Sequence, residues 1–431
     1  MKDKDMKFDD TPILNTLDQY LSKNPIRMHV PFHGGSSNND VFPEELYNLD
    51  ISEVSGYDIE GKDNPIFQSE ESTADFFGVK HSFYLTGGAS VGLLASMIAL
   101  NKFGKKVILA RNVHKSVVNG VILAGLEPVW LDVDFIEEWG IFSKVKADKL
   151  ESILSKNKDI AGCVIVSPTY EGVISDVRQI AGICHERNIP LIVDEAHGAH
   201  LFFVGVNYDK PLQCADLVIQ SWHKSLGSLT QTGVLHLVSN KYFNYKDIKR
   251  SLALVSSTSP SFLLLLSLEL TRKYLVDTKG AFFNLLLNNV LSLKEEMKKV
   301  NLLSVFDNDD PFKIYLKHGN LSGIDFAYSL YKEFSIEVES ANEVGFLMTI
   351  GKNFNKEIKN KIISALHEIS CKGLINQTHK KITDKPKCIS MKFNPRRAFM
   401  NGFKNMDDIE TEIYAPCPPG YIINIPGNKK C

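Results

Sequence analysis

The sequence predicts an α/β fold with a mainly parallel central sheet, helices on both of its faces and a smaller C-terminal α+β domain. Seven short apolar runs recur between residues 82 and 238, and helical patterns separate most of them. The runs are rich in Val, Ile and Leu without polar alternation, which is typical of strands buried on both faces. The predicted strands are Ser82–Leu85, Lys106–Ala110, Glu127–Leu131, Gly162–Val166, Leu191–Val193, Leu217–Gln220 and Val234–Val238.

Helical patterns between these runs predict the connections that parallel strands require. We expect an N-terminal arm over residues 1–45, with a helix at Pro12–Leu21, and then a large domain over residues 46–300. The large domain closes with a long helical region from Ser261 to Val300. Its connecting helices are predicted over Val91–Lys102, Lys115–Leu123, Ala147–Ser155 and Val177–Arg187.

Residues 301–431 are expected to form the smaller domain, because strand-like and helical patterns follow one another there at short intervals. It ends in a Pro-rich tail over Ala415–Gly427. Its predicted elements are strands over Phe312–Leu316, Ile336–Glu339 and Gly345–Ile350 and a helix over Lys356–Ser370.

The composition argues against several classes of function. With 49 basic and 51 acidic residues among 431, the chain lacks the excess of Lys and Arg that nucleic-acid binding needs. A hydrophobic fraction of 44% argues against a disordered chain. The apolar run Phe262–Leu266 is far shorter than the roughly 20 residues of a membrane-spanning helix. The charged start, Met1–Asp5, leads into no signal peptide.

The seven cysteines are odd in number, and no two of them have CxxC spacing. This pattern favours reduced thiols over a disulfide framework or a zinc site. We therefore expect a cytoplasmic protein with neither a nucleic-acid nor a membrane partner.

The turn after the first predicted strand has the composition of a phosphate-binding loop. It reads Leu85-Thr-Gly-Gly-Ala-Ser90 and runs into a predicted helix. Glycine allows close approach of the backbone, and free N–H groups at a helix N-terminus attract anions. Such turns are also common as purely structural features, and this one matches neither standard nucleotide-binding glycine motif.

Two further predicted strands end in ionisable residues. One leads into Asp194-Glu-Ala-His-Gly-Ala-His200, where a buried carboxylate needs a metal ion, an arginine or a protonated ring nitrogen as its partner. The other leads into Ser221-Trp-His-Lys224. A lone lysine after a strand is usually solvated, but a lysine in a desolvated pocket forms Schiff bases.

Together, these three segments have the layout of a pyridoxal-phosphate (PLP) site. Ligands of parallel sheets bind outside the carboxyl ends of the strands, and the lysine follows the aspartate by 224 − 194 = 30 residues. Lys224 would bind the cofactor aldehyde, and Asp194 would keep the pyridinium nitrogen protonated so that the ring accepts electrons from Cα. Ala196 is small enough to pack on one ring face, and His114, which follows another strand, can stack on the other.

With these features, the chain resembles the Orn/Lys/Arg decarboxylases, particularly their short bacterial form. The DEAHGAH and S-x-H-K motifs at this spacing are the most specific part of the resemblance, which extends over nearly the whole chain. The matching stretches are Arg111-Asn-Val-His-Lys-Ser116, Ser167-Pro-Thr-Tyr-Glu-Gly172, Asp194–His200, Ser221–Lys224, Thr258-Ser-Pro-Ser261 and Pro418-Pro-Gly420…Pro426-Gly427.

The resemblance implies fold type I of the PLP-dependent enzymes, a basic amino-acid substrate, and a homodimer or higher homo-oligomer with active sites at the subunit interface. Lys224, Asp194 and His114 correspond to the Schiff-base lysine, the pyridinium partner and the stacking histidine. Ser259 would reach the neighbouring subunit's site, and His197 would lie near the cofactor without an assigned role. The phosphate set would be Ser90, Ser221 and His223, and the full cofactor-binding set would be Gly88, Ala89, Ser90, His114, Asp194, Ala196, His197, Ser221, His223, Lys224 and Ser259.

The chain departs from the family pattern mainly around this core. Ala89 replaces one hydroxyl residue of the phosphate turn, and Glu171 replaces a tyrosine. Pro31-Phe-His-Gly34 stands where the family has Pro-Gly-His-Lys, and Arg397 and Asn428 each replace a glutamate. The cofactor residues are otherwise retained, whereas the periphery, where substrate choice is expected to be set, differs.

We therefore expect PLP-dependent decarboxylation of arginine, lysine or ornithine to the amine and CO2. Glu171 and Glu53 are candidates for binding the cationic end of the substrate, although each also reads as a solvated loop residue. Three alternatives stay open. They are another PLP reaction at Cα, such as transamination or elimination; a catalytically silent member with a regulatory or structural role; and a metal enzyme that uses His197, His200 and Glu195.

Overall fold

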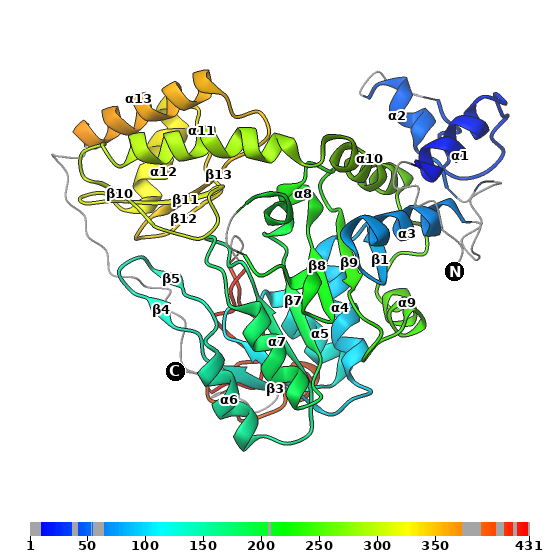
Figure 1. Ribbon diagram of the computed structural model, residues 1–431, viewed down its shortest axis with the longest axis horizontal. Coiled ribbons are helices and arrows are strands. Elements are labelled where there is room, and N and C mark those ends of the chain that lie inside the picture. The colour runs from blue at the N-terminus through cyan, green and yellow to red at the C-terminus, as the bar shows by residue number, and fades with distance from the viewer. Residues whose placement is uncertain are drawn as a thin grey trace. The chain divides into compact units, whose positions relative to one another are not determined.

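The main sheet of the computed structural model has seven strands in the order β1-β9-β8-β7-β6-β2-β3. Figure 1 shows β1, β9, β8 and β7 of this sheet side by side. All seven predicted strands are confirmed, and no strand end differs from its prediction by more than two residues. Their bounds are β1 His81–Leu85, β2 Lys106–Ala110, β3 Glu127–Leu131, β6 Ile160–Val166, β7 Leu191–Asp194, β8 Leu217–Gln220 and β9 Gly233–Leu237. The structure describes residues 10–36, 42–52, 54, 64–205, 208–372, 389–401, 409–416 and 420–429.

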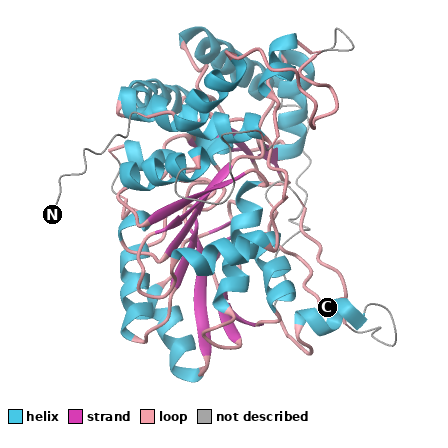
Figure 2. Cartoon of the chain, turned by 90° about the vertical axis from the view of Figure 1, so that its right-hand side faces the viewer, coloured by secondary structure: helices cyan, strands magenta, loops and turns pink. Residues whose placement is uncertain are grey.

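The predicted α/β class is confirmed. β2 pairs in parallel with β3 and β6, and β7 pairs in parallel with β8. β9 is the exception, because it runs antiparallel to both β8 and β1. All five residues of β9 are buried, so its apolar run reflects a central position in the sheet rather than parallel pairing. In Figure 2 the strands lie between helices.

The chain divides into two compact units. The first comprises residues 1–100, 192–199 and 211–280, and the second comprises residues 101–191, 200–210 and 281–431. The first unit contains β1, β8, β9 and all but the first residue of β7. Its helices are α1 Pro12–Leu21, α2 Glu44–Leu49, α3 Pro65–Phe77, α4 Gly88–Leu100, α8 Trp222–Ser225, α9 Tyr245–Ala253 and α10 Phe262–Thr278, with a 3₁₀ turn at Pro211–Gln213.

The helix boundaries of the first unit follow from local chemistry. The side chain of Asn64 accepts hydrogen bonds from the first turn of α3, and Gly78 ends the helix in the left-handed conformation. α4 begins at Gly88, three residues before its predicted start at Val91, and nine of its thirteen residues are buried. The region predicted as helical from 261 to 300 is interrupted at Lys279 and Gly280, whose φ angles of 50° and 67° end α10.

The second unit contains β2, β3 and β6, a hairpin of β4 Phe135–Ile136 and β5 Ile141–Phe142, and a four-stranded antiparallel sheet in the order β10-β11-β13-β12. The strands of the smaller sheet are β10 Leu303–Val305, β11 Lys313–His318, β12 Ser340–Ala341 and β13 Phe346–Thr349. The helices are α5 Lys115–Ala124, α6 Ala147–Lys156, α7 Val177–Glu186, α11 Ala281–Met297, α12 Gly323–Phe334, α13 Lys356–Lys372 and α14 Pro395–Asn401.

One predicted strand of the smaller sheet is wrong. Residues Ile336–Glu339 alternate between half-buried apolar and exposed acidic side chains, which is the pattern of a strand. They lie beside the edge of the sheet, and the N–H of Glu339 donates to the carbonyl of Leu347 at 2.9 Å. Regular pairing begins only with β12 at Ser340.

A buried carboxylate from α10 caps the N-terminal arm. Thr11, at the N-cap position of α1, makes no side-chain capping bond. Instead, the N–H groups of Ile13 and Leu14 donate to the two carboxylate oxygens of Glu269, at 3.1 and 2.9 Å. Glu269 thereby supplies acceptors in the first turn of the helix, where the helix itself offers none.

We expect Glu269→Ala to loosen this arm, because the first turn of α1 loses two hydrogen bonds to the buried carboxylate. The free energy of unfolding should fall by about 1–3 kcal/mol, and proteases should cleave α1 faster. Glu269→Gln, which keeps one acceptor oxygen, should lose less. Urea denaturation and limited proteolysis test both variants, and an unchanged cleavage rate in Glu269→Ala would contradict the capping role.

Candidate active site

Three segments predicted to carry the chemistry converge in the first unit, at the ends of β1, β7 and β8. β7 and β8 pair in parallel with Asp194 opposite Ile219, so the segments that follow them leave the sheet at one edge. β9 begins at the same edge, where Gly233 pairs with Leu85 at the end of β1. This edge is where ligands of parallel sheets bind.

Asp194 is buried at the end of β7, and its Oδ1 accepts a hydrogen bond from the N–H of Ala196 at 3.1 Å. Burial raises the pKa of Asp194 to about 6, against the opposing effects of this N–H and of the positive charge on Lys224. An ionised carboxylate at such a place is costly unless a positive group pairs with it. A protonated pyridine nitrogen is a group of that kind, so the site suits the predicted cofactor.

Lys224 lies in α8, and its Nζ is 3.0 Å from Nε2 of His197. An ammonium group only donates hydrogen bonds, so Nε2 of His197 is the acceptor, and a neutral His197 carries its hydrogen on Nδ1. Lys224 is exposed and His197 is half-buried. The amine is therefore accessible to a ligand and has a proton acceptor beside it.

The glycine turn forms a cradle at the start of α4. Gly88 has a φ of +75°, a conformation that favours glycine. A Cβ on Gly233 would lie 3.0 Å from the nitrogen of Ala89 and 2.7 Å from the carbonyl oxygen of Gln220, so the backbones approach this closely only without a side chain. The N–H groups in the first turn of a helix lack partners within the helix and favour an anion. Ser90 is exposed in that turn.

Two more residues of the predicted phosphate set lie beside the lysine. Nδ1 of His223 is 2.7 Å from the carbonyl oxygen of Thr232 and must donate to it. When the ring is protonated, Nε2 becomes a second donor that can bind an anion. Ser221 is buried, and its hydroxyl makes no capping bond to α8. The donor set therefore fits a phosphate group.

A buried hydrogen-bond network lies next to Asp194. Oε1 of Gln220 accepts from Nε1 of Trp222 at 2.9 Å and from Nε2 of His236 at 3.1 Å. These bonds fix the orientation of the amide, so its Nε2 donates to Glu195 at 2.7 Å. Burial lowers the pKa of His236 to about 3, and the hydroxyl of Ser82 donates to the Nδ1 of this neutral ring at 2.9 Å.

Glu195 has a higher pKa than the adjacent Asp194. Burial raises its pKa to about 8; the bond from Gln220 opposes this shift, and the charge of Asp194 adds to it. Asp194, with a pKa of about 6, is therefore the carboxyl of the pair that ionises first as the pH rises.

We expect Glu195→Gln to flatten the pH dependence of stability of the cofactor-free protein. The folded state keeps the Glu195 proton to about pH 8, whereas the unfolded chain releases it near pH 4.5. The folded state therefore binds more protons in this range, and the free energy of unfolding falls as the pH rises through it. Between about pH 5 and pH 8, the free energy of unfolding measured with urea should fall less in the variant than in the parent protein. An equal fall in the two proteins would contradict the raised pKa of Glu195.

His114, the predicted stacking residue, lies in the second unit as the N-cap of α5. Its Nδ1 accepts from the N–H of Ser116 at 3.2 Å and lies 2.7 Å from the Ser116 hydroxyl. A neutral His114 therefore carries its hydrogen on Nε2. The ring is half-buried. Its stacking role stays a prediction.

Ser259 is exposed in the loop between α9 and α10, where its N–H donates to the hydroxyl of Ser257 at 3.1 Å. Its role toward a neighbouring subunit stays a prediction. Glu171 is not the solvated loop residue considered from the sequence. It is buried, and the hydroxyl of Tyr421 donates to its Oε2 at 2.9 Å. Glu53, Pro418, Pro419, Cys388, Cys417 and Cys431 lie outside the described residues.

His200, from the same motif as Asp194, has a structural partner. Its Nε2 is 3.0 Å from Oδ1 of Asp310, and both side chains are buried. Burial alone would raise the pKa of Asp310, but His200 and Lys313 together lower it below its usual value. Within the described part of the chain, no three His, Cys, Asp or Glu side chains come together as a potential metal site.

A comparison with known protein families matches residues 11–430 to the Orn/Lys/Arg decarboxylase major domain. The chain belongs to the Orn/Lys/Arg decarboxylase family. It is an amino-acid decarboxylase, and the family implies pyridoxal 5′-phosphate as its cofactor.

Relatives of this decarboxylase carry several substrate names. An arginine decarboxylase of Bacillus cereus is 26% identical over 446 residues, which covers 97% of this chain and 96% of the relative. An inducible ornithine decarboxylase of a Lactobacillus species is 24% identical and covers 68% and 46% of the two chains. The constitutive lysine decarboxylase of Escherichia coli has a similar fold, with a TM-score of 0.80 at 16% identity over 97% of this chain and 76% of that one. The fold-type-I prediction is confirmed.

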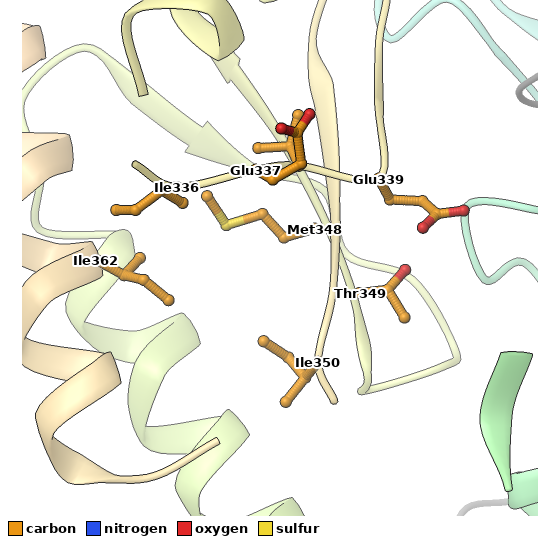
Figure 3. Close-up of a pocket in the computed structure, with 8 residues that line it drawn as sticks. Ile336, Glu337, Glu339, Met348, Thr349, Ile350 and Ile362 are labelled. Carbon is orange, nitrogen blue, oxygen red and sulfur yellow. The ribbon is translucent and has the colours of Figure 1, made fainter. Parts of the chain in front are cut away.

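The second unit of this decarboxylase contains a cavity of about 250 Å³ between β13, α13 and residues 336–339. Figure 3 shows the side chains of Ile336, Met348, Ile350 and Ile362 gathered along it. The other lining residues are Glu337, Val338, Glu339 and Thr349. None of the predicted cofactor residues lines this cavity. Among the helices that the structure describes, none is long and apolar enough to cross a membrane.

Sequence reasoning missed several residues that shape the site. Gly233 lies against the glycine turn, and the carbonyl of Thr232 accepts a hydrogen bond from His223. A Thr-Gly pair at the start of a strand is not a sequence motif that indicates either role. The apolar run that ends at Gln220 predicts a strand but not the bond of Gln220 to Glu195. The polar side chain at the end of this apolar strand is the signal that indicates a buried hydrogen-bond partner.

Proposed function

We propose that this chain uses PLP to decarboxylate a basic L-amino acid, namely arginine, lysine or ornithine, to the corresponding amine and CO2. One observation carries the proposal. A single unit places an accessible lysine, a buried strand-end carboxylate and a glycine-lined helix N-terminus at the same edge of the sheet. Membership of the Orn/Lys/Arg decarboxylase family supports the proposal.

Each part of the cofactor has proposed protein partners. The N–H groups at Gly88 to Ser90, with the hydroxyls of Ser90 and Ser221 and the ring of His223, would hold the phosphate. Asp194 would pair with the ring nitrogen, and Ala196 and His114 would pack on the two ring faces. Lys224 would bond to the aldehyde. The burial and pKa of Asp194 and the donors of Ser221 and His223 support their assignments.

When bound, the cofactor takes up the electron pair that CO2 leaves behind at Cα. Lys224 must lose its proton before its amine can react, and His197, 3.0 Å away, is placed to take that proton. Asp194 would supply the negative charge that keeps the ring nitrogen protonated. A proton must also reach Cα after CO2 has left, and His197, His223 and Lys224 are the candidate acids.

Arginine is the first substrate to test, because the relative that matches nearly the full chain is named an arginine decarboxylase. The relatives named for ornithine and lysine keep these two amino acids in the panel. All three substrates carry a cationic end that an acidic side chain would bind.

Mass spectrometry of the products, after incubation of PLP-loaded protein with arginine, lysine, ornithine and other amino acids, tests the proposal. We expect one amine that is lighter than its parent by CO2. Keto acids or elimination products would replace the proposal by other PLP chemistry. Bound PLP without any product would indicate a catalytically silent protein.

We also propose that the active enzyme is a homodimer. The N-terminal arm exposes large apolar side chains, including Met28 at 89% and Phe32 at 99% exposure, which a second subunit would cover. Sedimentation velocity is expected to give a dimer mass. The double variant Phe32→Ser, Met28→Ser should form a weaker dimer. A parent protein that sediments with the mass of a monomer would contradict the proposal.

We place the enzyme in the cytoplasm. Cys163 and Cys184 are buried neighbours whose thiols interact without a disulfide, and the exposed Cys371 forms no disulfide either. Reduced thiols of this kind suit a reducing compartment. Fractionation of the host cell with a tagged chain tests this location, and recovery outside the cytoplasmic fraction would contradict it.

A further inference from the structure

A segment near the C-terminus, residues 420–422, docks on the loop that follows β2. His114 and Tyr421 form an antiparallel β-bridge, and the N–H of Lys115 donates to the carbonyl of Gly420 at 3.3 Å. The guanidinium of Arg111 donates to the carbonyl of Ile422 at 2.7 Å. Three consecutive residues of this segment thus contact the loop that carries His114.

Gly420 lies directly against the imidazole of His114. Its φ of +81° favours glycine, and a Cβ at this position would lie 2.6 Å from Cδ2 and 2.8 Å from Nε2 of the ring. Real side-chain contacts are not this close, so only glycine leaves the ring in its present place. Ser116 holds the opposite edge of the ring through Nδ1. The contacts with Gly420 and Ser116 therefore lie on opposite edges of the His114 ring.

Tyr421 anchors the segment to the interior of the second unit. Its hydroxyl donates to Oε2 of Glu171 at 2.9 Å and accepts from the N–H of Tyr170 at 3.3 Å. Its ring packs edge-on against Phe142, with ring centroids 5.2 Å apart. Burial raises the pKa of Glu171, and the bond from Tyr421 satisfies this buried carboxyl group. Glu171, which stands where the family pattern has a tyrosine, therefore has a hydrogen-bond partner in the folded chain.

We propose that residues 420–422 form a positioning element that sets the orientation of the His114 imidazole, with Gly420 as the contact and Tyr421 as the anchor. The inference deepens the proposed function, because its benefit to the enzyme rests on the proposed contact between His114 and PLP. Gly420 and Tyr421 act through His114 and are positioning residues.

The first test is Gly420→Ala, read out by NMR of ¹⁵N-labelled histidine in the cofactor-free protein. The His114 signals, assigned by their loss in His114→Gln, should shift, because the added methyl displaces the ring. The Kd for PLP should rise about tenfold, since small misplacements of a contact group are costly. Gly78→Ala is the matched control, because Gly78 also has a positive φ of 70° but no atom within 4 Å of an added Cβ.

Tyr421→Phe keeps the ring and removes only the hydroxyl. This variant tests the inference if Gly420→Ala does not fold. We expect a smaller shift of the His114 signals and a rise of about threefold in Kd, the scale of one lost hydrogen bond. Unchanged His114 signals in the folded variants would overturn the inference. Shifted signals with an unchanged Kd would uphold the positioning element and instead contradict the proposed contact between His114 and PLP.

Discussion

Replacing Lys224 with alanine is expected to abolish decarboxylation and the covalent attachment of PLP. The variant removes an amine whose Nζ lies 3.0 Å from a proton acceptor, Nε2 of His197. Loss of a nucleophile on which other groups converge lowers turnover by about 10³-fold or more. Amine formation measures the activity, and borohydride reduction followed by peptide mass spectrometry locates the attachment.

Lys246→Ala is the matched control, because Lys246 is an exposed lysine of α9 in the same unit. It should retain both activity and attachment. Turnover close to the parent rate in Lys224→Ala, or a reduced cofactor on another lysine of the parent protein, would refute the assignment of Lys224.

Asp194→Asn is expected to keep part of the cofactor affinity and to lose most of the activity. The amide can still bond to the ring nitrogen but has no charge to keep it protonated, so the electron-accepting power of the ring falls. We expect turnover to fall by about 10²–10⁴-fold, the range typical for loss of one charge-stabilising group. Steady-state kinetics and a PLP-binding titration separate the two effects.

Glu195→Gln is the matched comparison, because it makes the same change from acid to amide one residue along the chain. With a pKa of about 8, Glu195 is already neutral at pH 7, so its variant should lose less than tenfold in activity. Near-normal turnover in Asp194→Asn, or equal losses in the two variants, would contradict the role given to Asp194.

Much of the first unit could be predicted because its signals are local. An apolar run such as Leu217–Gln220 identifies a buried strand regardless of its neighbours. The motifs that follow β7 and β8 then come together because parallel pairing brings Asp194 opposite Ile219. Resemblance to a family added the assignment of roles, which spacing alone left open.

The unpredicted features depend on contacts between distant residues. Gly420 lies against His114 across 306 positions (420 − 114), and Glu171 bonds to Tyr421 across 250. The local sequence around either residue of such a pair does not indicate which residue it contacts. The prediction of a strand at Ile336–Glu339 was wrong for a related reason. Alternation of apolar and polar side chains is a property of the segment alone, whereas a strand also needs regular pairing, which begins only at Ser340.

The bond between Glu171 and Tyr421 also has a consequence for how the protein is made. Position 171 leaves the ribosome long before position 421, so the nascent chain carries an acidic group whose final hydrogen-bond donor has not yet been synthesised. A message that stops before codon 421 yields a product with every proposed cofactor residue but without that donor. Such a product should be less stable and more readily degraded, so survival of the protein in the cell should depend on translation beyond codon 421.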